Sequence, residues 1–129
     1  MKKPTFRTAM IITVLTVLAL YGYGCRLIFN GVETYTRDAQ ATYGGEPAMA
    51  LIALVEDESA SFEKRNSAIW ALGQLGDKRA LLALHKLDTG EIQNPPYDST
   101  AYIVQYSVEK AISQINRFSI VRWMYRWLD

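Results

Sequence analysis

Residues 65–87 read RNSAIWALGQLGDKRALLALHKL and decide the fold of this 129-residue chain. The apolar side chains of the first half recur at a helical spacing and form one stripe, at Ala68, Ile69, Leu72 and Leu75. Those of the second half form another, at Ala80, Leu81, Leu84 and Leu87. Between the stripes, Gly76 can end a helix in the left-handed conformation, and Asp77 can cap the helix that follows. The stretch therefore predicts two amphipathic helices joined by a very tight turn.

Gly73 and Gly76 both lower helix propensity. Because glycine has no side chain, however, a neighbouring backbone can approach closely at these positions. The pattern of the whole stretch resembles HEAT repeats. It consists of Arg65, an alanine a few residues later, ALGQLGD at residues 71–77, and a second helix rich in Ala and Leu. The resemblance is to the short HEAT-like repeats of the phycobilin-lyase type. It implies a right-handed α-solenoid that stacks repeats and binds a partner. Its structural residues would be Leu72, Gly73, Gly76, Asp77 and Leu84.

Weaker copies of the pattern flank the central pair. Residues 46–59 resemble the second helix of a preceding repeat, and residues 104–117 resemble the first helix of a following one. The later copy departs from the pattern, because Ser113 and Asn116 replace both glycines. We therefore expect an all-α fold with a HEAT-like repeat domain at residues 46–129, built from two to three helical pairs.

An insertion interrupts the repeat spacing after the second helix. We place it at residues 89–100, because Pro95 and Pro96 exclude an α-helix there. Aromatic residues on the loops of a repeat scaffold often contact partners, and packing of the long loop onto the last repeat is the alternative role. Three tyrosines in and just after the insertion are candidates for partner binding: Tyr97, Tyr102 and Tyr106.

An uncharged, apolar segment lies near the N-terminus. No charged residue stands between Arg7 and Arg26, and a helix of those 18 residues would be about 27 Å long, close to the thickness of the hydrocarbon core of a bilayer. We expect a transmembrane helix or uncleaved signal anchor at residues 8–29 and a juxtamembrane linker at residues 30–45. The alternatives are a cleaved secretory signal, a lipoprotein signal acylated at Cys25, and a buried helix of a soluble protein.

Basic residues around this segment indicate its orientation. Residues 1–7 carry three of them, whereas two, Arg26 and Arg37, follow the apolar segment. The excess of positive charge favours a basic N-terminus in the cytoplasm and a repeat domain on the other side of the membrane. The expected product is a single-pass membrane protein.

Residues 118–128 are predicted to form an amphipathic helix. Large apolar side chains recur there at a helical spacing, at Ile120, Trp123, Met124, Trp127 and Leu128. The helix would either cap the open end of the stack or lie in a membrane interface or a partner's groove. In the second role the contacting residues would be Arg122, Trp123, Arg126 and Trp127.

The sequence shows no pattern typical of a catalytic, metal or cofactor site. His85 is the only histidine, and one imidazole does not provide the usual number of metal ligands. Nucleotide-binding and nucleophile motifs are absent. An acidic cluster lies around the loop before the central helix, at Glu56, Asp57, Glu58 and Glu63. Such a cluster is usually a solvated loop, and its alternative roles are a weak calcium site or a site for a basic partner.

Charge narrows the classes of function further. From Gly44 onward, nine Lys and Arg stand against eleven Asp and Glu, a net charge of −2. A nucleic-acid-binding protein would need a basic surface instead. We expect a membrane-anchored scaffold or adaptor that binds another protein, without enzymatic activity, cofactor, metal or small-molecule substrate. The alternatives are an accessory protein similar to phycobilin lyase subunits, an envelope lipoprotein anchored through Cys25, and a subunit that completes another protein's stack.

Overall fold

The computed structural model describes residues 5–117 and Trp123. Within them the chain forms α-helices and one short 3₁₀-helix, and no β-strand occurs. The elements are α1 (Phe6–Tyr43), α2 (Pro47–Glu56), α3 (Phe62–Leu75), η1 (Lys78–Ala80), α4 (Leu81–Leu87) and α5 (Gln105–Ile115). The all-α fold predicted from the sequence is confirmed. Of the helix expected at residues 118–128, only Trp123 lies inside the described residues.

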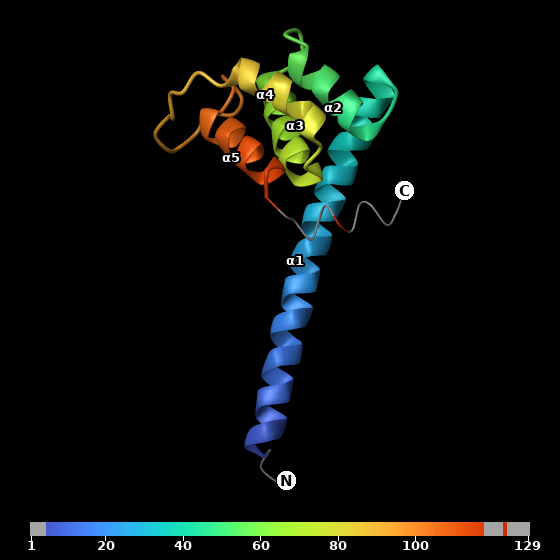
Figure 1. Ribbon diagram of the computed structural model, residues 1–129, viewed down its shortest axis with the longest axis vertical. Coiled ribbons are helices and arrows are strands. Elements are labelled where there is room, and N and C mark those ends of the chain that lie inside the picture. The colour runs from blue at the N-terminus through green and yellow to red at the C-terminus, as the bar shows by residue number, and fades with distance from the viewer. Residues whose placement is uncertain (1–4, 118–122, 124–129) are drawn as a thin grey trace.

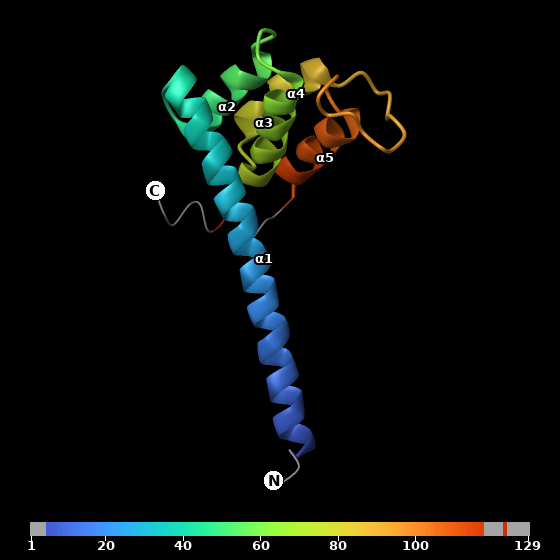
Figure 2. The same ribbon diagram turned by 180° about the vertical axis from the view of Figure 1, so that it is seen from behind.

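α1 is one unbroken helix of 38 residues whose two halves have different surroundings. The N-terminal half projects away from the other helices as a stalk (Figures 1 and 2). Large apolar side chains along the stalk are exposed, among them Leu15, Leu18 and Leu20. The C-terminal half packs against α2 and α3. One helix therefore belongs both to the stalk and to the packed domain.

The expectation of a juxtamembrane linker, helical in part, at residues 30–45 is corrected for residues 30–43, all of which continue α1 as helix. Their buried residues, Val32, Thr36 and Ala39, are spaced by four and three positions and so lie on one helical face. Two of these three residues are a threonine and an alanine, whereas leucines at the same positions would have indicated a buried helical face clearly. The chain leaves the helix only at Gly44 and Gly45, whose φ angles of 69° and 79° favour glycine.

The remaining helices stack in two layers. The C-terminal half of α1 lies beside α3, and α3 lies beside α5, while α2 and α4 form the second layer. α2 contacts both α1 and α3, and α4 contacts α5. A single core runs through both layers, and its largest fully buried side chains are Val32, Leu51, Val55, Ile69, Leu72, Leu84, Val108 and Ile115. This is the packing of stacked helical repeats.

The turn after α3 has the conformation that its residues favour. Gly76 has φ 67° and ψ 26°, in the left-handed region, and its N–H donates to the carbonyl of Leu72 at 3.0 Å. Oδ1 of Asp77 accepts a hydrogen bond from the N–H of Arg79 at 2.9 Å. The chain thus restarts as η1 immediately after α3 ends, and η1 leads directly into α4.

Gly73 allows α3 and α5 to approach each other closely. It is buried, and a Cβ added at this position would lie 2.9 Å from Cα and 3.1 Å from Cβ of Ala111. The backbone of α5 therefore occupies the space that any larger residue at position 73 would need.

We expect Gly73→Ala to lower the free energy of unfolding by about 1–3 kcal/mol, because the new methyl group must displace the backbone of α5. Chemical unfolding of the full chain in detergent micelles, followed by near-ultraviolet circular dichroism, measures this loss. Gly24→Ala is the control, since a Cβ at Gly24 meets nothing within 4 Å. Equal stability of the two variants would contradict the close approach of the helices.

Candidate functional site

Arg65, at the start of the sequence motif, joins α3 to the preceding helix. Its side chain is buried, and its Nε donates to the carbonyl of Val55 at 2.9 Å. Val55 lies in the last turn of α2, where carbonyls lack helical partners and the helix dipole attracts a cation. The arginine of the motif therefore connects one repeat to the next.

The irregular segment at residues 88–104 connects α4 to α5 and is held by Asn66 of α3. Asn66 is buried beside it. Its Nδ2 donates to the carbonyl oxygens of Ser99 at 3.0 Å and of Tyr102 at 2.9 Å. Its Oδ1 accepts a hydrogen bond from the N–H of Val104 at 3.0 Å. One side chain thus fixes three backbone groups of the segment.

Gln105, the first residue of α5, holds the other end of this segment. Its Oε1 accepts a hydrogen bond from the N–H of Thr89 at 2.9 Å, and its Nε2 donates to the carbonyl of Leu87 at 3.1 Å. Oε1 of Gln93 accepts in turn from the backbone N–H of Gln105 at 3.1 Å. The irregular segment extends to Val104, beyond the boundary at residue 100 that the repeat spacing predicted. It is fastened to the repeats at both ends.

Two of the three tyrosines predicted to bind a partner lie against each other. The rings of Tyr97 and Tyr106 are stacked, with centroids 5.7 Å apart and planes 6° apart. Nζ of Lys110 lies 5.6 Å from the centroid of the exposed Tyr106 ring. We call these three residues the tyrosine surface. Tyr102 has a different place, because its hydroxyl accepts a hydrogen bond from the N–H of Asp98 at 3.0 Å within the loop.

The other residues predicted to contact a partner belong to the C-terminal segment. Trp123 is exposed. Arg122, Arg126 and Trp127 lie outside the described residues, so their role stays a prediction. His85 is exposed on α4.

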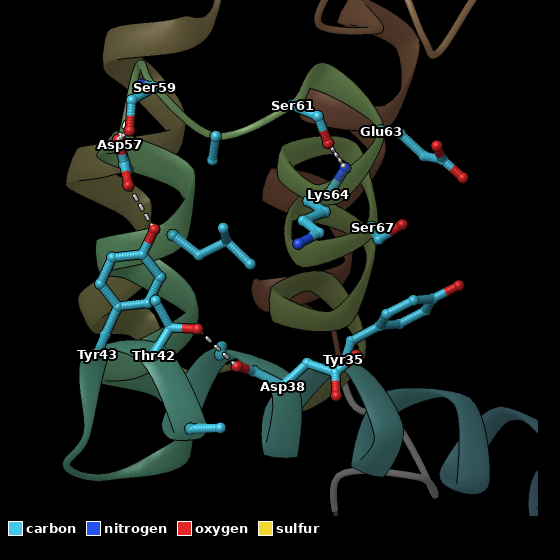
Figure 3. A pocket seen from close by; sticks show the side chains of 14 residues that line it. Tyr35, Asp38, Thr42, Tyr43, Asp57, Ser59, Ser61, Glu63, Lys64 and Ser67 are labelled. Carbon is cyan, nitrogen blue, oxygen red and sulfur yellow. Dashed lines mark hydrogen bonds between the residues drawn. The ribbon is translucent and has the colours of Figure 1, made fainter.

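A groove of about 860 Å³ runs between the C-terminal half of α1, the loop after α2 and the first turns of α3. Figure 3 shows its side chains, which come from all three elements. Hydroxyl groups and charged groups predominate among the labelled ones. The residues that matter most for its chemistry are Tyr35, Asp38, Tyr43, Asp57, Glu63 and Lys64. We call this feature the groove.

Asp57, which follows α2, is the most extensively hydrogen-bonded carboxylate of the groove. Its Oδ1 accepts hydrogen bonds from the N–H and the hydroxyl of Ser59, at 2.8 and 2.6 Å. Its Oδ2 accepts one from the hydroxyl of Tyr43 at 2.5 Å. The bonds from Ser59 and then Tyr43 favour the charged form and lower the pKa of Asp57 to about 2. Donation to Asp57 raises the pKa of Tyr43. The pair ties the end of α1 to the loop after α2.

The sequence indicated only part of the groove. Asp57 and Glu63 belong to the acidic cluster that is visible in the sequence. Tyr35, Asp38 and Tyr43 were missed, because they lie in the segment interpreted as a linker. Extending the helical period beyond residue 29 would have placed them on α1.

Comparison with known families matches residues 64–88 to the PBS lyase HEAT-like repeat. The matched segment includes most of α3, the turn at Gly76, η1 and all of α4. It supports the resemblance to HEAT-like repeats for this helix pair and suggests a helical repeat protein. No curated protein and no solved structure matches the chain.

We expect Asn66→Ala to lower the free energy of unfolding by about 2–3 kcal/mol, because it removes one buried and two partly buried hydrogen bonds worth roughly 1 kcal/mol each. Amide hydrogen exchange should accelerate selectively in residues 88–104. The matched control is Asn116→Ala, which removes a single exposed bond to the carbonyl of Ile112. Unchanged exchange in the Asn66 variant would show that the loop is held by other contacts.

We expect Tyr43→Phe to raise the pKa of Asp57 from about 2 toward its ordinary value of 3.8. Because the folded-state pKa is the lower one, these bonds contribute their full stability above about pH 4 and lose it as the pH falls toward 2. Carboxyl ¹³C chemical shifts across an acid titration give the pKa directly. The control is Tyr35→Phe in the same groove, whose ring packs edge-on against Trp70. Identical titration curves for Asp57 in the two variants would refute the assigned cause.

Proposed function

We propose that this protein is a membrane-anchored helical-repeat scaffold or adaptor that binds another protein and has no enzymatic activity. The double role of α1 carries the proposal. In the described part of the chain, α1 is the one helix long and apolar enough to cross a membrane, and only 6% of its most apolar window is buried. Its C-terminal half is also the first helix of the repeat stack.

The exposed stalk supports a bilayer as its surroundings. Leu15, Leu18 and Leu20 each leave more than half of their surface uncovered, at 59%, 59% and 66%. Each such side chain would gain about 1.5–3 kcal/mol from leaving water, and a continuous row of them marks a surface that contacts lipid or protein. A transmembrane span at residues 8–29, with the N-terminus in the cytoplasm, accounts for this exposure.

A protein cleaved before Cys25, whether or not Cys25 is then acylated, would keep the packed domain. Among described residues of α1, the buried ones are Cys25, Val32, Thr36 and Ala39, and all of them would remain after a cut before Cys25. Intact mass of the membrane-extracted protein distinguishes these forms from the uncleaved anchor.

Partner binding is supported by the repeat architecture and by the tyrosine surface. HEAT-like repeats commonly mediate protein interactions, and Tyr97 and Tyr106 present stacked aromatic rings on a loop that hydrogen bonds hold in place. A preformed loop loses little conformational entropy on binding, and tyrosine is enriched among the residues that dominate interface energies.

The role of a phycobilin lyase accessory protein is less well supported. A bilin carries carboxylate groups, and the carboxylates of the groove would repel them.

Substitution of one exposed leucine by arginine tests the anchor. We expect Leu18→Arg to shift the protein from the membrane to the soluble fraction, because a charge near the middle of a span costs about 2.5–3.5 kcal/mol. Leu82→Arg is the matched control, since Leu82 is exposed on α4 and should tolerate the charge. Flotation on a density gradient after alkaline extraction separates the two outcomes.

The same membranes test partner binding. A photo-crosslinking residue at Tyr106 should yield a discrete adduct with another protein, and one at Leu82 should not. Equal flotation of both arginine variants would contradict the anchor, and the absence of a selective adduct would contradict the role assigned to the tyrosine surface.

A further inference from the structure

The groove carries an excess of negative charge that the rest of the described chain does not neutralise. Asp38, Asp57 and Glu63 supply three carboxylates, and Lys64 supplies one amine. The ion pairs within residues 5–117 join other residues, and none of these four charged groups takes part in one. The groove therefore has a net charge of −2 that is open to a positively charged ligand.

The three carboxylates are spread around the groove. Asp38 comes from α1, Asp57 follows α2, and Glu63 comes from α3, at separate places along the walls (Figure 3). The described residues contain no group of three or more acidic, His or Cys side chains close enough to hold one metal ion. These carboxylates are thus placed to meet several positive groups rather than a single cation.

The remaining lining suits an extended peptide. The hydroxyl of Ser67 lies among the charged side chains, and so does that of Thr42, which donates to the carbonyl of Asp38 at 3.3 Å. Both hydroxyl oxygens can accept hydrogen bonds from the N–H groups of a peptide backbone. A volume of about 860 Å³ lies within the range of ligand-binding pockets. We propose that the groove binds an extended, basic segment of a partner protein, with Lys and Arg side chains of that segment on Asp38, Asp57 and Glu63.

The unbroken α1 places this site at a defined height, if the membrane attachment proposed above holds. The groove uses α1 from Tyr35 to Tyr43. At 1.5 Å per residue, these positions lie roughly 9–21 Å beyond residue 29, the expected end of the span. An extended chain covers about 3.3 Å per residue, so a basic segment tethered to a span of its own would reach the groove from roughly three to six residues outside that span. A partner segment bound in the groove therefore lies within roughly 21 Å of the end of the span, whether or not the partner itself crosses the membrane.

Peptide binding to the full chain in detergent micelles tests the charge complementarity. The probe is a fluorescent nonapeptide of alternating Lys and Ser, and anisotropy reports its Kd. We expect the double variant Asp38→Asn and Glu63→Gln to weaken binding at least tenfold, and added salt to weaken binding to the unaltered chain. The control double variant, Glu91→Gln and Glu109→Gln, removes the same charge from exposed residues outside the groove and should change Kd less than twofold.

Three results would overturn the proposal. They are equal binding of a matched Glu/Ser nonapeptide, equal effects of the two double variants, and no measurable binding of the basic probe. Because this assay needs no bilayer, loss of the membrane anchor in the Leu18→Arg test leaves its outcome unaffected. The two proposals can therefore fail separately.

A second measurement tests the height. Single-span peptides with the basic segment starting 4 or 14 residues outside the span are reconstituted with the full chain in vesicles of zwitterionic lipid. A photo-crosslinking residue at Ser67 should capture the nearer segment at least fivefold more efficiently. Equal capture of both peptides would overturn the membrane-proximal placement.

Discussion

α3 is enclosed by α1 and α2 on one side and by α5 on the other, and the rest of the fold depends on this enclosure. Burial of one apolar side chain contributes about 1.5–3 kcal/mol, whereas ordering a dozen residues costs on the order of 1.5 kcal/mol for each of them. A single amphipathic helix therefore does not remain folded alone. Ile69 and Leu72 become fully buried only because neighbouring helices cover α3 from both directions. Gly73 brings α5 close enough to complete that cover, and Arg65 connects α3 to the end of α2.

The parts of the fold that follow from local rules could be predicted from the sequence. The turn between α3 and η1 depends on a glycine with positive φ and an aspartate that accepts a hydrogen bond, so Gly76 and Asp77 indicate it without knowledge of the remaining chain. Residues 30–43 show the opposite case. Their buried face includes Thr36 and Ala39, and such residues bury well only against the particular neighbours that α2 and α3 provide. The helical period continues through that segment, but it gives a weak signal because Thr36 and Ala39 stand where large apolar residues would mark a buried face.

The functional surfaces depend even more on contacts between distant parts of the chain. The hydrogen bonds from Asn66 to the irregular segment join residues more than 30 positions apart, and an asparagine within a helix gives no sign of them in the sequence. The stacking of Tyr97 on Tyr106 follows from that loop geometry, although both residues could be selected as candidates from their type alone. Asp57 and Glu63 were visible as an acidic cluster. That they line one groove with Asp38 required knowledge that α1 continues past residue 29.

The absence of a break in α1 between Phe6 and Tyr43 also has a mechanical consequence. A membrane-spanning helix adjusts to the thickness of its bilayer mainly by leaning, and an inclination of about 20° is average. If α1 spans a membrane as proposed, its unbroken continuation into the packed domain means that such an inclination would carry Tyr43 sideways by roughly 7 Å relative to residue 29, the expected end of the span. The position of the packed domain above the membrane surface would then depend on the inclination of the helix, and so on the lipid composition of the bilayer.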